Sequence, residues 1–415
     1  MHKKDRRALV LGSQGGVGRS VLTLLDRTDV GRQLLDDLDA VVLADRVPAH
    51  GPVPLRSGVQ LPPVSIRSGD DLARLIREHQ ITDVIDLSSL DTIDCARVCD
   101  DLGANFLCTS IEEWAGHNPL PTDAAIARLL PEHRPVLERG SYLVGSGANP
   151  GIVNALAFEA IEEFASRVDV APSVAALDLY AILITEEDTT VELDDDGSSD
   201  VFAMTWSPWH CLEEMFEPAS FAASNGRVHS LGHEPTACWY EARCGDRLIE
   251  GMAVPHEEIV TLAQRFPSVE IGFIYRLPPA ARRALKAHPE RRLAQNWATR
   301  KLYPPTTDRL TGHDRLGVLL CSRRFGELWM GFDTAVAAGL TFGTNATQLQ
   351  VAAGVLAGWS QLGRQRGIHF VEDLDCREFI QVAAEVLGPP IVVRDPAATP
   401  VSLIGRRSRS FAATA

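Results

Sequence analysis

A glycine-rich segment near the start of the chain constrains the fold more than any other feature. The segment Gly12–Gly18 lies between an apolar run over residues 8–12 and a segment, 15–25, whose apolar residues have helical spacing. Glycines at such a strand-to-helix turn let the backbone approach a pyrophosphate, and the free N–H groups of the helix attract it. The pattern is GxxGxxG rather than the strict GxGxxG, so it needs support from the segments that follow.

Those segments alternate between apolar runs and stretches with helical spacing. The predicted strands are 40–44, 83–87 and 105–109, and the predicted helices are 71–79 and 91–102. This alternation is typical of a buried parallel sheet with helices on its faces. We therefore predict an α/β chain whose residues 1–150 form a Rossmann domain that binds a dinucleotide; a purely structural glycine loop is the alternative. The predicted cofactor contacts in the loop are Gly12, Gly15, Gly16, Val17 and Gly18.

The sequence pattern changes near residue 150. A helix from Pro150 to Phe164, a strand over 177–184 and further strands with polar breaks follow, and a strong helix is predicted over 345–362. We predict a second, α+β domain for substrate and dimerisation over 151–340. Helices within about 340–400 are expected to pack back on the first domain. The basic end of the chain, 405–415, is predicted to be a disordered tail.

Composition narrows the classes of function. The chain has 415 residues, a formal net charge of −15 and a pI of about 5.3, which argues against nucleic-acid binding and suits a cationic substrate. No apolar run approaches the ~18 residues of a membrane helix, and the basic start of the chain indicates a lead-in to the first strand rather than a signal peptide. The eight cysteines and twelve histidines lack metal-ligand spacing. We expect a cytoplasmic protein with a small-molecule substrate and no metal site.

Asp45 indicates which dinucleotide is bound. It ends the second predicted strand, where a carboxylate accepts hydrogen bonds from the ribose hydroxyls of NAD and repels the 2′-phosphate of NADP. The interval from Gly18 to Asp45 exceeds the usual span of about 20 residues, and the polar stretch 26–39 accounts for the extra length. We predict NAD as the cofactor, and the neighbouring Arg46 keeps NADP as the alternative.

Four later segments carry polar or aromatic residues in unusual positions. They are a turn before a helix, 147–151; acids after an apolar strand, TEEDT (185–189); TWSPWHCLEE (205–214); and MAVPHEE (252–258). In the third, Ser207 as N-cap and Pro208 as the first helical residue place His210 and Glu214 on one helix face. Each segment alone has an ordinary explanation: a solvated acid cluster, core tryptophans or a hydrogen-bonded histidine. Spacing alone does not join them into one site.

Together and in this order, these segments resemble the bacterial homospermidine synthase family, part of the saccharopine-dehydrogenase-like group. The similarity extends over nearly the whole chain. It includes VIDLSSLD…CDDLGANFLCTSIEEW (84–114), SGANPG (146–151), TEEDT (185–189), TWSxxxxxxE (205–214), VPHEE (254–258), DRLGVLL (314–320), NATQLQVAAGVLAGW (345–359) and GIHFVEDLD (367–375). The resemblance implies a Rossmann domain, a substrate domain with a mixed sheet, and a homodimer. It also implies a reaction in which NAD oxidises an amine of putrescine to an imine, a second amine adds, and the same hydride reduces the new imine.

The resemblance also assigns roles to individual residues. Asn149 is expected near the nicotinamide and the substrate, and Ser88 and Thr109 are expected to contact the cofactor. Trp206 would face the cationic amine, a cation–π contact worth about 0.5–2 kcal/mol. The remaining expected site residues are Glu214 and either Glu187 or Glu186 for the ammonium groups, His256 as a proton carrier, and Asp314 in the acidic wall.

The chain also departs from the family's pattern. Met204 stands where the family has Asn before Thr-Trp, Glu257 stands where it has Gly after Pro-His, and the stretch 207–243 matches poorly. The changes affect the substrate wall more than the cofactor site. Putrescine as the substrate is therefore less well supported than the redox chemistry.

Two other functions remain as alternatives. One is a reductive-condensation enzyme of the same group that joins an amine to an aldehyde or keto acid with external NAD(P)H. Such an enzyme needs an arginine for the substrate carboxylate, and Arg276, Arg300 or Arg323 is the candidate. The other is a protein that binds NAD without catalysis. The presence of His256, a candidate proton carrier, argues against it.

The Asp45 argument predicts that Asp45→Ala weakens NAD binding and narrows the difference in affinity between NAD and NADP. Titration of both dinucleotides against the purified protein measures this. Tighter binding of NADP than of NAD by the unmodified protein would show that the argument is wrong.

Overall fold

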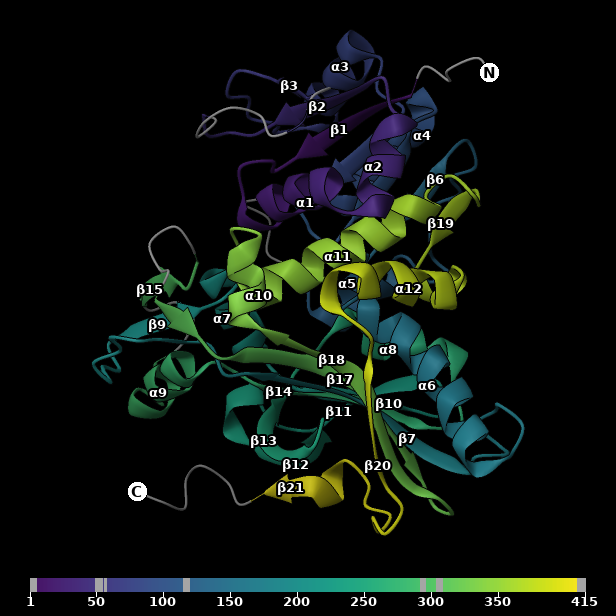
Figure 1. The fold of residues 1–415 in the computed structure, drawn as a ribbon, viewed down its shortest axis with the longest axis vertical. Helices are drawn as coiled ribbons and strands as arrows, with labels where there is room; N and C mark the ends of the chain where they lie inside the picture. Colours follow the sequence, from purple (N-terminus) through teal and green to yellow (C-terminus); the bar gives the residue numbers. More distant parts are fainter. Residues whose placement is uncertain are drawn as a thin grey trace. The chain divides into compact units, whose positions relative to one another are not determined.

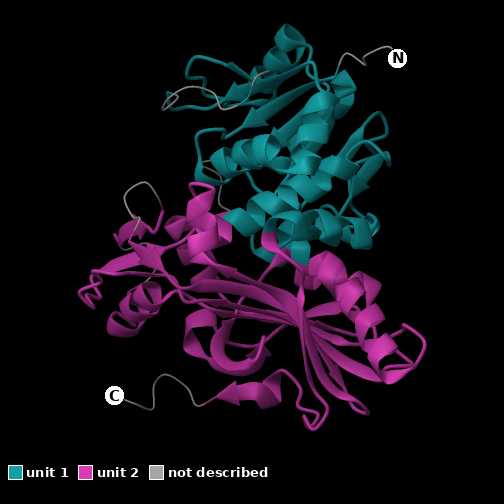
Figure 2. Cartoon of the chain, in the orientation of Figure 1, with its two compact units in different colours: residues 1–152, 349–386 teal, residues 153–348, 387–415 magenta. Residues whose placement is uncertain are grey.

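The computed structural model describes residues 6–48, 55, 58–114, 120–291, 296–303 and 309–408. The chain forms two compact units, coloured separately in Figure 2: residues 1–152 with 349–386, and residues 153–348 with 387–415. The chain thus leaves the first unit after residue 152 and returns to it at residue 349, in the first turn of a long helix. Among the described residues, no helix has the length and apolar character needed to cross a membrane.

The first unit contains a seven-stranded parallel sheet. Its strands are β1 (Arg7–Leu11), β2 (Ala40–Ala44), β3 (Gly58–Gln60), β4 (Asp83–Asp86), β5 (Asn105–Cys108), β6 (Ser141–Leu143) and β19 (Gly367–His369). The order across the sheet is β19-β6-β5-β4-β1-β2-β3, and every neighbouring pair is parallel. Figure 1 labels β3, β2 and β1 toward one end of the sheet and β6 and β19 toward the other. The order β3-β2-β1-β4-β5-β6 is that of dinucleotide-binding folds, in which the ligand lies at the carboxyl ends of the strands. This confirms the predicted Rossmann sheet.

The helices of the first unit follow the predicted alternation. They are α1 (Gly16–Arg27), α2 (Asp29–Asp36), α3 (Gly69–His79), α4 (Thr92–Leu102), α5 (Thr122–Ala127), α12 (Cys376–Leu387) and, from residue 349, α11 (Ala346–Gln361). Ser68 and Asp91 cap α3 and α4 by accepting hydrogen bonds from backbone N–H groups of the first turn, as their residue types favour.

Two glycines explain why α11 fits against the turn that follows β6. A Cβ on Gly354 would lie 1.9 Å from the carbonyl oxygen of Gly147, and a Cβ on Gly358 would lie 2.0 Å from Oγ of Ser146. The Ser146 hydroxyl also donates a hydrogen bond to the Gly354 carbonyl at 3.0 Å. The backbone of the 345–359 motif therefore contacts the SGANPG turn closely, and glycine at positions 354 and 358 is what permits this contact.

The second unit is built on a mixed sheet of ten strands. The strands are β7 (Leu179–Asp188), β10 (Phe221–Ser224), β11 (Arg227–Ser230), β12 (Trp239–Cys244), β13 (Arg247–Ala253), β14 (Glu270–Arg276), β17 (His313–Ser322), β18 (Gly326–Ala335), β20 (Ile391–Asp395) and β21 (Arg407–Ser408). The main path is β20-β18-β17-β7-β14-β13-β12-β21, with β10 pairing β14 and β11. The central strand β7 runs parallel to β14 and antiparallel to β17. The predicted mixed sheet is confirmed.

Shorter elements complete the second unit. They are α6 (Ile152–Val168, from residue 153), α7 (Pro208–Met215), α8 (Glu257–Arg265), α9 (Pro279–Ala287), α10 (Val336–Thr341), and the strand pairs β9 (Val201–Met204) with β15 (Ala298–Lys301) and β8 (Val191–Glu192) with β16 (Leu310–Thr311). Ser207 caps α7 by accepting from the His210 N–H, and Pro208 is its first residue, as predicted.

Two sequence-based expectations need correction. The strand predicted over 177–184 is longer, because β7 continues to Asp188 and carries the TEED acids inside the sheet rather than after it. The tail predicted from residue 405 begins with ordered structure: Arg407 and Ser408 form β21 against β12, and Arg406 forms an ion pair with Glu327. The rest of that tail, 409–415, lies outside the described residues.

Candidate functional site

The residues predicted to contact the cofactor lie at one edge of the parallel sheet. The glycine loop follows β1, Asp45 follows β2, Ser88 comes after β4 and Thr109 after β5, while Asn149 lies in the loop after β6. The carboxyl ends of parallel strands meet at the same edge, which is where ligands bind in this fold. The first unit therefore gathers these residues at one edge of its sheet, and their contact with a cofactor stays a prediction.

The glycine loop has the close backbone packing that a phosphate loop requires. Gly12 has a φ of +71°, and a Cβ there would lie 2.4 Å from the Leu87 carbonyl oxygen; a Cβ on Gly18 would lie 2.3 Å from the Gly12 carbonyl oxygen. Gly15, the N-cap of α1, offers no side-chain cap, and the first turn of the helix contains no acid. The N–H groups at this helix end and its dipole thus fit a pyrophosphate.

Asp45 is held against this loop. Its Oδ2 accepts a hydrogen bond from the Gln14 N–H at 2.8 Å, and its Oδ1 accepts one from the Val47 N–H at 3.1 Å. Each carboxylate oxygen can accept a further bond, so the group remains able to bind ribose hydroxyls. Ser88 donates instead to Asp86 at 2.5 Å. Burial raises the pKa of Asp86 to about 6, although the Ser88 hydrogen bonds oppose the rise.

In the second unit, the acids of β7 alternate between the two faces of the mixed sheet. Successive side chains of a strand point to opposite faces, and directly paired residues on neighbouring strands point to the same face. Glu186 pairs with Tyr275 of β14 and with Leu316 of β17, and Asp188 pairs with Asp314. Glu186, Asp188, Tyr275 and Asp314 therefore share one face, which we call the acid face.

Aromatic residues and α7 lie against the acid face. Trp206, which is partly exposed rather than a core residue, donates from Nε1 to the Tyr275 hydroxyl at 3.2 Å. Burial, and then the charges of Glu186 and Asp188, raise the pKa of Tyr275. Burial, followed by Glu214, Glu186 and Asp188, raises the pKa of Cys211. These shared neighbours place Glu214 of α7 close to the β7 acids.

Asp188 and Asp314 form a buried carboxyl pair. Asp188 Oδ2 accepts from Thr205 Oγ1 at 2.7 Å, and Asp314 Oδ2 accepts from Thr347 Oγ1 at 2.5 Å. Burial raises the pKa of both groups, and the charge of Asp188 raises that of Asp314 further. Two adjacent buried carboxylates cannot both ionise cheaply, so the ionisation of one opposes the ionisation of the other.

His256 is surrounded by carboxyl groups. Its Nδ1 binds Glu258 Oε2 and lies 3.2 Å from Glu257 Oε2, and its Nε2 lies 3.7 Å from Glu214 Oε1. Desolvation opposes a charged imidazole, but the three carboxylates, Glu258 first, raise the pKa of His256 well above its ordinary value. Burial raises the pKa of Glu214 to about 8, and the His256 charge limits the rise.

A ring contact connects this cluster to the acid face. The His256 ring lies edge-on to Phe273 with centroids 5.4 Å apart, and Phe273 stacks on Tyr275 at 5.8 Å. The structure thus brings together Trp206, Glu214, His256, Asp314 and Glu186 of the predicted substrate residues. Among the described residues, His256, Glu257 and Glu258 also form a group whose ligand atoms lie within 4.8 Å. Because Nδ1 already binds Glu258, we attribute the group to proton binding, and the absence of a metal stays a prediction.

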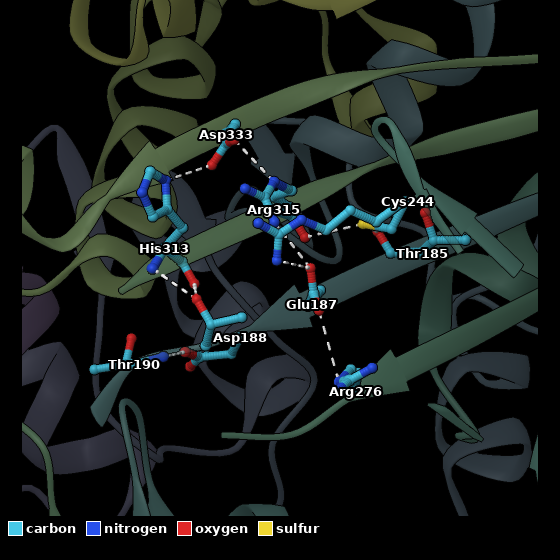
Figure 3. A network of polar contacts seen from close by, with 11 residues as sticks. Thr185, Glu187, Asp188, Thr190, Cys244, Arg276, His313, Arg315 and Asp333 are labelled. Carbon is cyan, nitrogen blue, oxygen red and sulfur yellow. Dashed lines mark hydrogen bonds and ion pairs between the residues drawn. The ribbon is translucent and has the colours of Figure 1, made fainter. Parts of the chain in front are cut away.

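Glu187 lies on the other face of the sheet. Its carboxylate accepts from Arg315 Nη1 at 2.9 Å and lies 3.6 Å from Arg276 Nε (Figure 3). The carboxylate also lies 3.8 Å from Arg247 Nη1. Arg315 also donates to Asp333 at 2.8 Å. Glu187 thus bridges strands β7, β13, β14 and β17, and of the two acids considered from the sequence, Glu186 is the one on the acid face.

The three arginines proposed for a substrate carboxylate are engaged elsewhere. Arg276 faces Glu187, Arg300 pairs with Glu192, and Arg323 pairs with Asp178 at 3.3 Å. Arg300 and Arg323 are exposed. None of the three lies on the acid face.

Several residues of the site were not identified from the sequence. Tyr275 and Glu258 carried no motif signal of their own, although VPHEE includes Glu258. Asn345 donates to the carbonyl oxygens of Thr205 and Leu302 at 2.6 and 2.8 Å. The NATQ start of the 345–359 motif was the available signal, because it fixes the segment that precedes Trp206.

Comparison with known proteins supports a single relationship. No protein-family model matches the chain. Homospermidine synthase of Mesorhizobium japonicum is 23% identical over 421 residues, covering 89% of this chain and 84% of the relative. Homospermidine synthase of Blastochloris viridis is 26% identical over 358 residues, covering 74% of each.

Solved structures share the fold. Homospermidine synthase of Legionella pneumophila, solved in complex with NAD, superimposes with a TM-score of 0.79 at 20% identity, over 95% of this chain and 92% of that one. The apo form of saccharopine dehydrogenase (L-Glu forming) from Saccharomyces cerevisiae gives a TM-score of 0.54 at 11% identity, over 94% of this chain and all (100%) of that one.

The two faces of β7 predict unequal effects of removing neighbouring charges. Glu187→Gln should lower the free energy of unfolding by about 2–3 kcal/mol, because it leaves the nearly buried Arg315 with one acid partner fewer. Glu186→Gln should lower the free energy of unfolding less, because the residues directly opposite Glu186 are Tyr275 and Leu316, whereas those opposite Glu187 are arginines. Urea unfolding of both variants measures the difference, and equal destabilisation by the two would contradict the assignment of faces.

Proposed function

Because the chain is a divergent member of the homospermidine synthase family, we propose that it acts on a diamine or a related amine through imine intermediates, with NAD recycled in each turnover. The observation that carries the proposal is the acid face. Four acids, Glu186, Asp188, Asp314 and Glu214, gather there beside the hydrogen-bonded side chains of Trp206 and Tyr275. Carboxylates and an indole face are the groups that bind organic ammonium ions.

The acid face suits a substrate with two positive charges. Burial of an ionised carboxylate has a desolvation cost, which a bound ammonium ion offsets. Each acid that ionises when the substrate binds can therefore pair with an ammonium group of that substrate. Glu214 on α7 and Glu186 on β7 supply charge from separate elements of the second unit, which fits two separated amino groups. We propose Glu186 rather than Glu187 for this role, because Glu187 is already paired with arginine.

The site also has groups for proton transfer. Exchange of one amine for another at an imine carbon requires a proton to leave the incoming nitrogen and to reach the departing one. Glu214, with its pKa raised to about 8, and the adjacent His256 lie where they can carry that proton. Trp206, whose indole N–H binds Tyr275, would present its ring to the cation.

The first unit has the groups that NAD requires. The uncapped start of α1 and the glycine loop would hold the pyrophosphate, and Asp45 would hold the adenosine ribose. Ser88, Thr109 and Asn149, at the same sheet edge, would contact the rest of the cofactor. When bound, NAD accepts a hydride from the amine carbon and gives it back to the carbon of the new imine.

The position of the arginines favours this reaction over the alternatives. Reductive condensation with an amino acid or keto acid needs a cation for the substrate carboxylate, and Arg276, Arg300 and Arg323 pair with acids away from the acid face. A binding protein without catalysis would not need the proton-binding cluster at His256. Both alternatives are therefore less well supported.

Assembly and location belong to the same proposal. We propose a homodimer, as the family resemblance implies, and a cytoplasmic location. The eight cysteines are unpaired, which suits a reducing compartment.

Recycling of the hydride predicts a specific isotope pattern. A diamine deuterated at its α-carbons should give a secondary amine that carries deuterium on the newly formed C–N carbon, with catalytic NAD and no added reductant. Mass spectrometry of the product measures this. If diamines react only with stoichiometric NADH or NADPH, the reductive-condensation reaction takes the place of this proposal.

A further inference from the structure

His256 begins α8 as its N-cap residue, but its side chain does not cap the helix. The side chains that usually occupy this position accept a hydrogen bond from the first turn. The imidazole is instead turned toward carboxyl groups and against the edge of Phe273. Its orientation is therefore set by those acids.

Glu258 is the acid that fixes the ring. It is fully buried, with 0% of its surface exposed, and its Oε2 binds His256 Nδ1. Its Oε1 has no hydrogen-bond partner among the residues that the structure describes. A buried carboxylate with one partner is stable only if that partner donates a proton to it, so Nδ1 carries a hydrogen.

The other ring nitrogen then faces Glu214. His256 Nε2 lies 3.7 Å from Glu214 Oε1, a separation that a small movement on substrate binding would close. His256 thus lies between two acids: the fully buried Glu258 on the Nδ1 side and the partly exposed Glu214 on the Nε2 side. A buried carboxylate that orients a histidine toward a reacting group is a common arrangement in enzymes.

Building on the proposed function, we propose that Glu258 is a positioning residue that holds His256 as a charged imidazolium beside Glu214, and that Glu214 is the group that moves the proton during amine exchange. Glu214 takes a proton from the incoming nitrogen as the new C–N bond forms. It gives that proton to the other nitrogen as the old C–N bond breaks and ammonia leaves. The imidazolium keeps Glu214 ionised often enough to accept the proton.

The charges around the cluster agree with this assignment. The groups that face His256 are Glu257 and Glu258 on α8 and Glu214 on α7, and Glu217 adds its charge near Glu214. The three acids keep His256 protonated, and the resulting positive charge is the largest influence that lowers the pKa of Glu214. Loss of the Glu258 charge should therefore lower the pKa of His256 and raise that of Glu214.

The first test is NMR of the protein labelled with isotope in its histidine rings, assigned by comparison with His256→Asn. In the unmodified protein, His256 should remain charged at pH 7.5 with a proton on Nδ1, and in Glu258→Gln it should titrate at lower pH. The exposed Glu162→Gln, on α6, is the matched control and should leave the titration unchanged. A His256 that titrates near 6.5 in the unmodified protein, or identically in Glu258→Gln, overturns the proposal.

The second test uses catalysis. Glu258→Gln should lower kcat/KM for the diamine about 10-fold at pH 7 and move the acid limb of its pH profile upward by about one unit. In a His256→Asn background, Glu258→Gln should cause little further loss, because its effect passes through the ring. Additive losses in this double-mutant cycle contradict the positioning role. A protein that turns over no diamine contradicts the proposed function instead, and the NMR result still decides the role of Glu258.

Discussion

The alternation of side chains along β7 is the constraint on which the second unit depends. Glu186, Glu187 and Asp188 are consecutive, but the strand directs the first and third to one face of the sheet and the second to the other. The pairing of β7 with β17 continues through all three residues, and the pairing with β14 continues through Glu186 and Glu187, so none of the three can turn away into solvent. A short acidic sequence is thereby divided between a structural ion-pair network and the acid face.

The two groups of acids are stabilised in different ways. Glu187 is compensated by cations, chiefly Arg315, and through these ion pairs it joins strands of the sheet. On the acid face, burial raises the pKa values of Asp188 and Asp314, and it raises that of Glu214 to about 8, so that Glu214 is compensated largely by protonation at pH 7. A protonated acid can release its proton when a cation arrives, whereas an arginine-paired acid has no vacancy for one. Under the proposed function, the acid face can thus accept an ammonium substrate at little cost to the folded state.

The sequence was informative where local chemistry determines structure. The glycine loop, Asp45 after β2, and the Ser207 cap with Pro208 are all where local rules place them. The choice between Glu186 and Glu187 could not be made, because it depends on how far strands distant in the sequence pair with β7. The contacts of Tyr275 with Trp206 and of Thr347 with Asp314 likewise join residues far apart in the chain. No periodicity or motif in a single sequence contains that information.

The claim that Glu214 on the acid face is protonated before a dication binds can be tested directly. Putrescine binding to the enzyme loaded with NADH, which cannot accept a hydride, can be followed by calorimetry at pH 7 in two buffers of different ionisation enthalpy. Because burial raises the pKa of Glu214 to about 8 and a bound ammonium ion lowers it, binding should release about one proton or more. Glu214→Gln should reduce that release. Binding without proton exchange, or with proton uptake, would contradict the account.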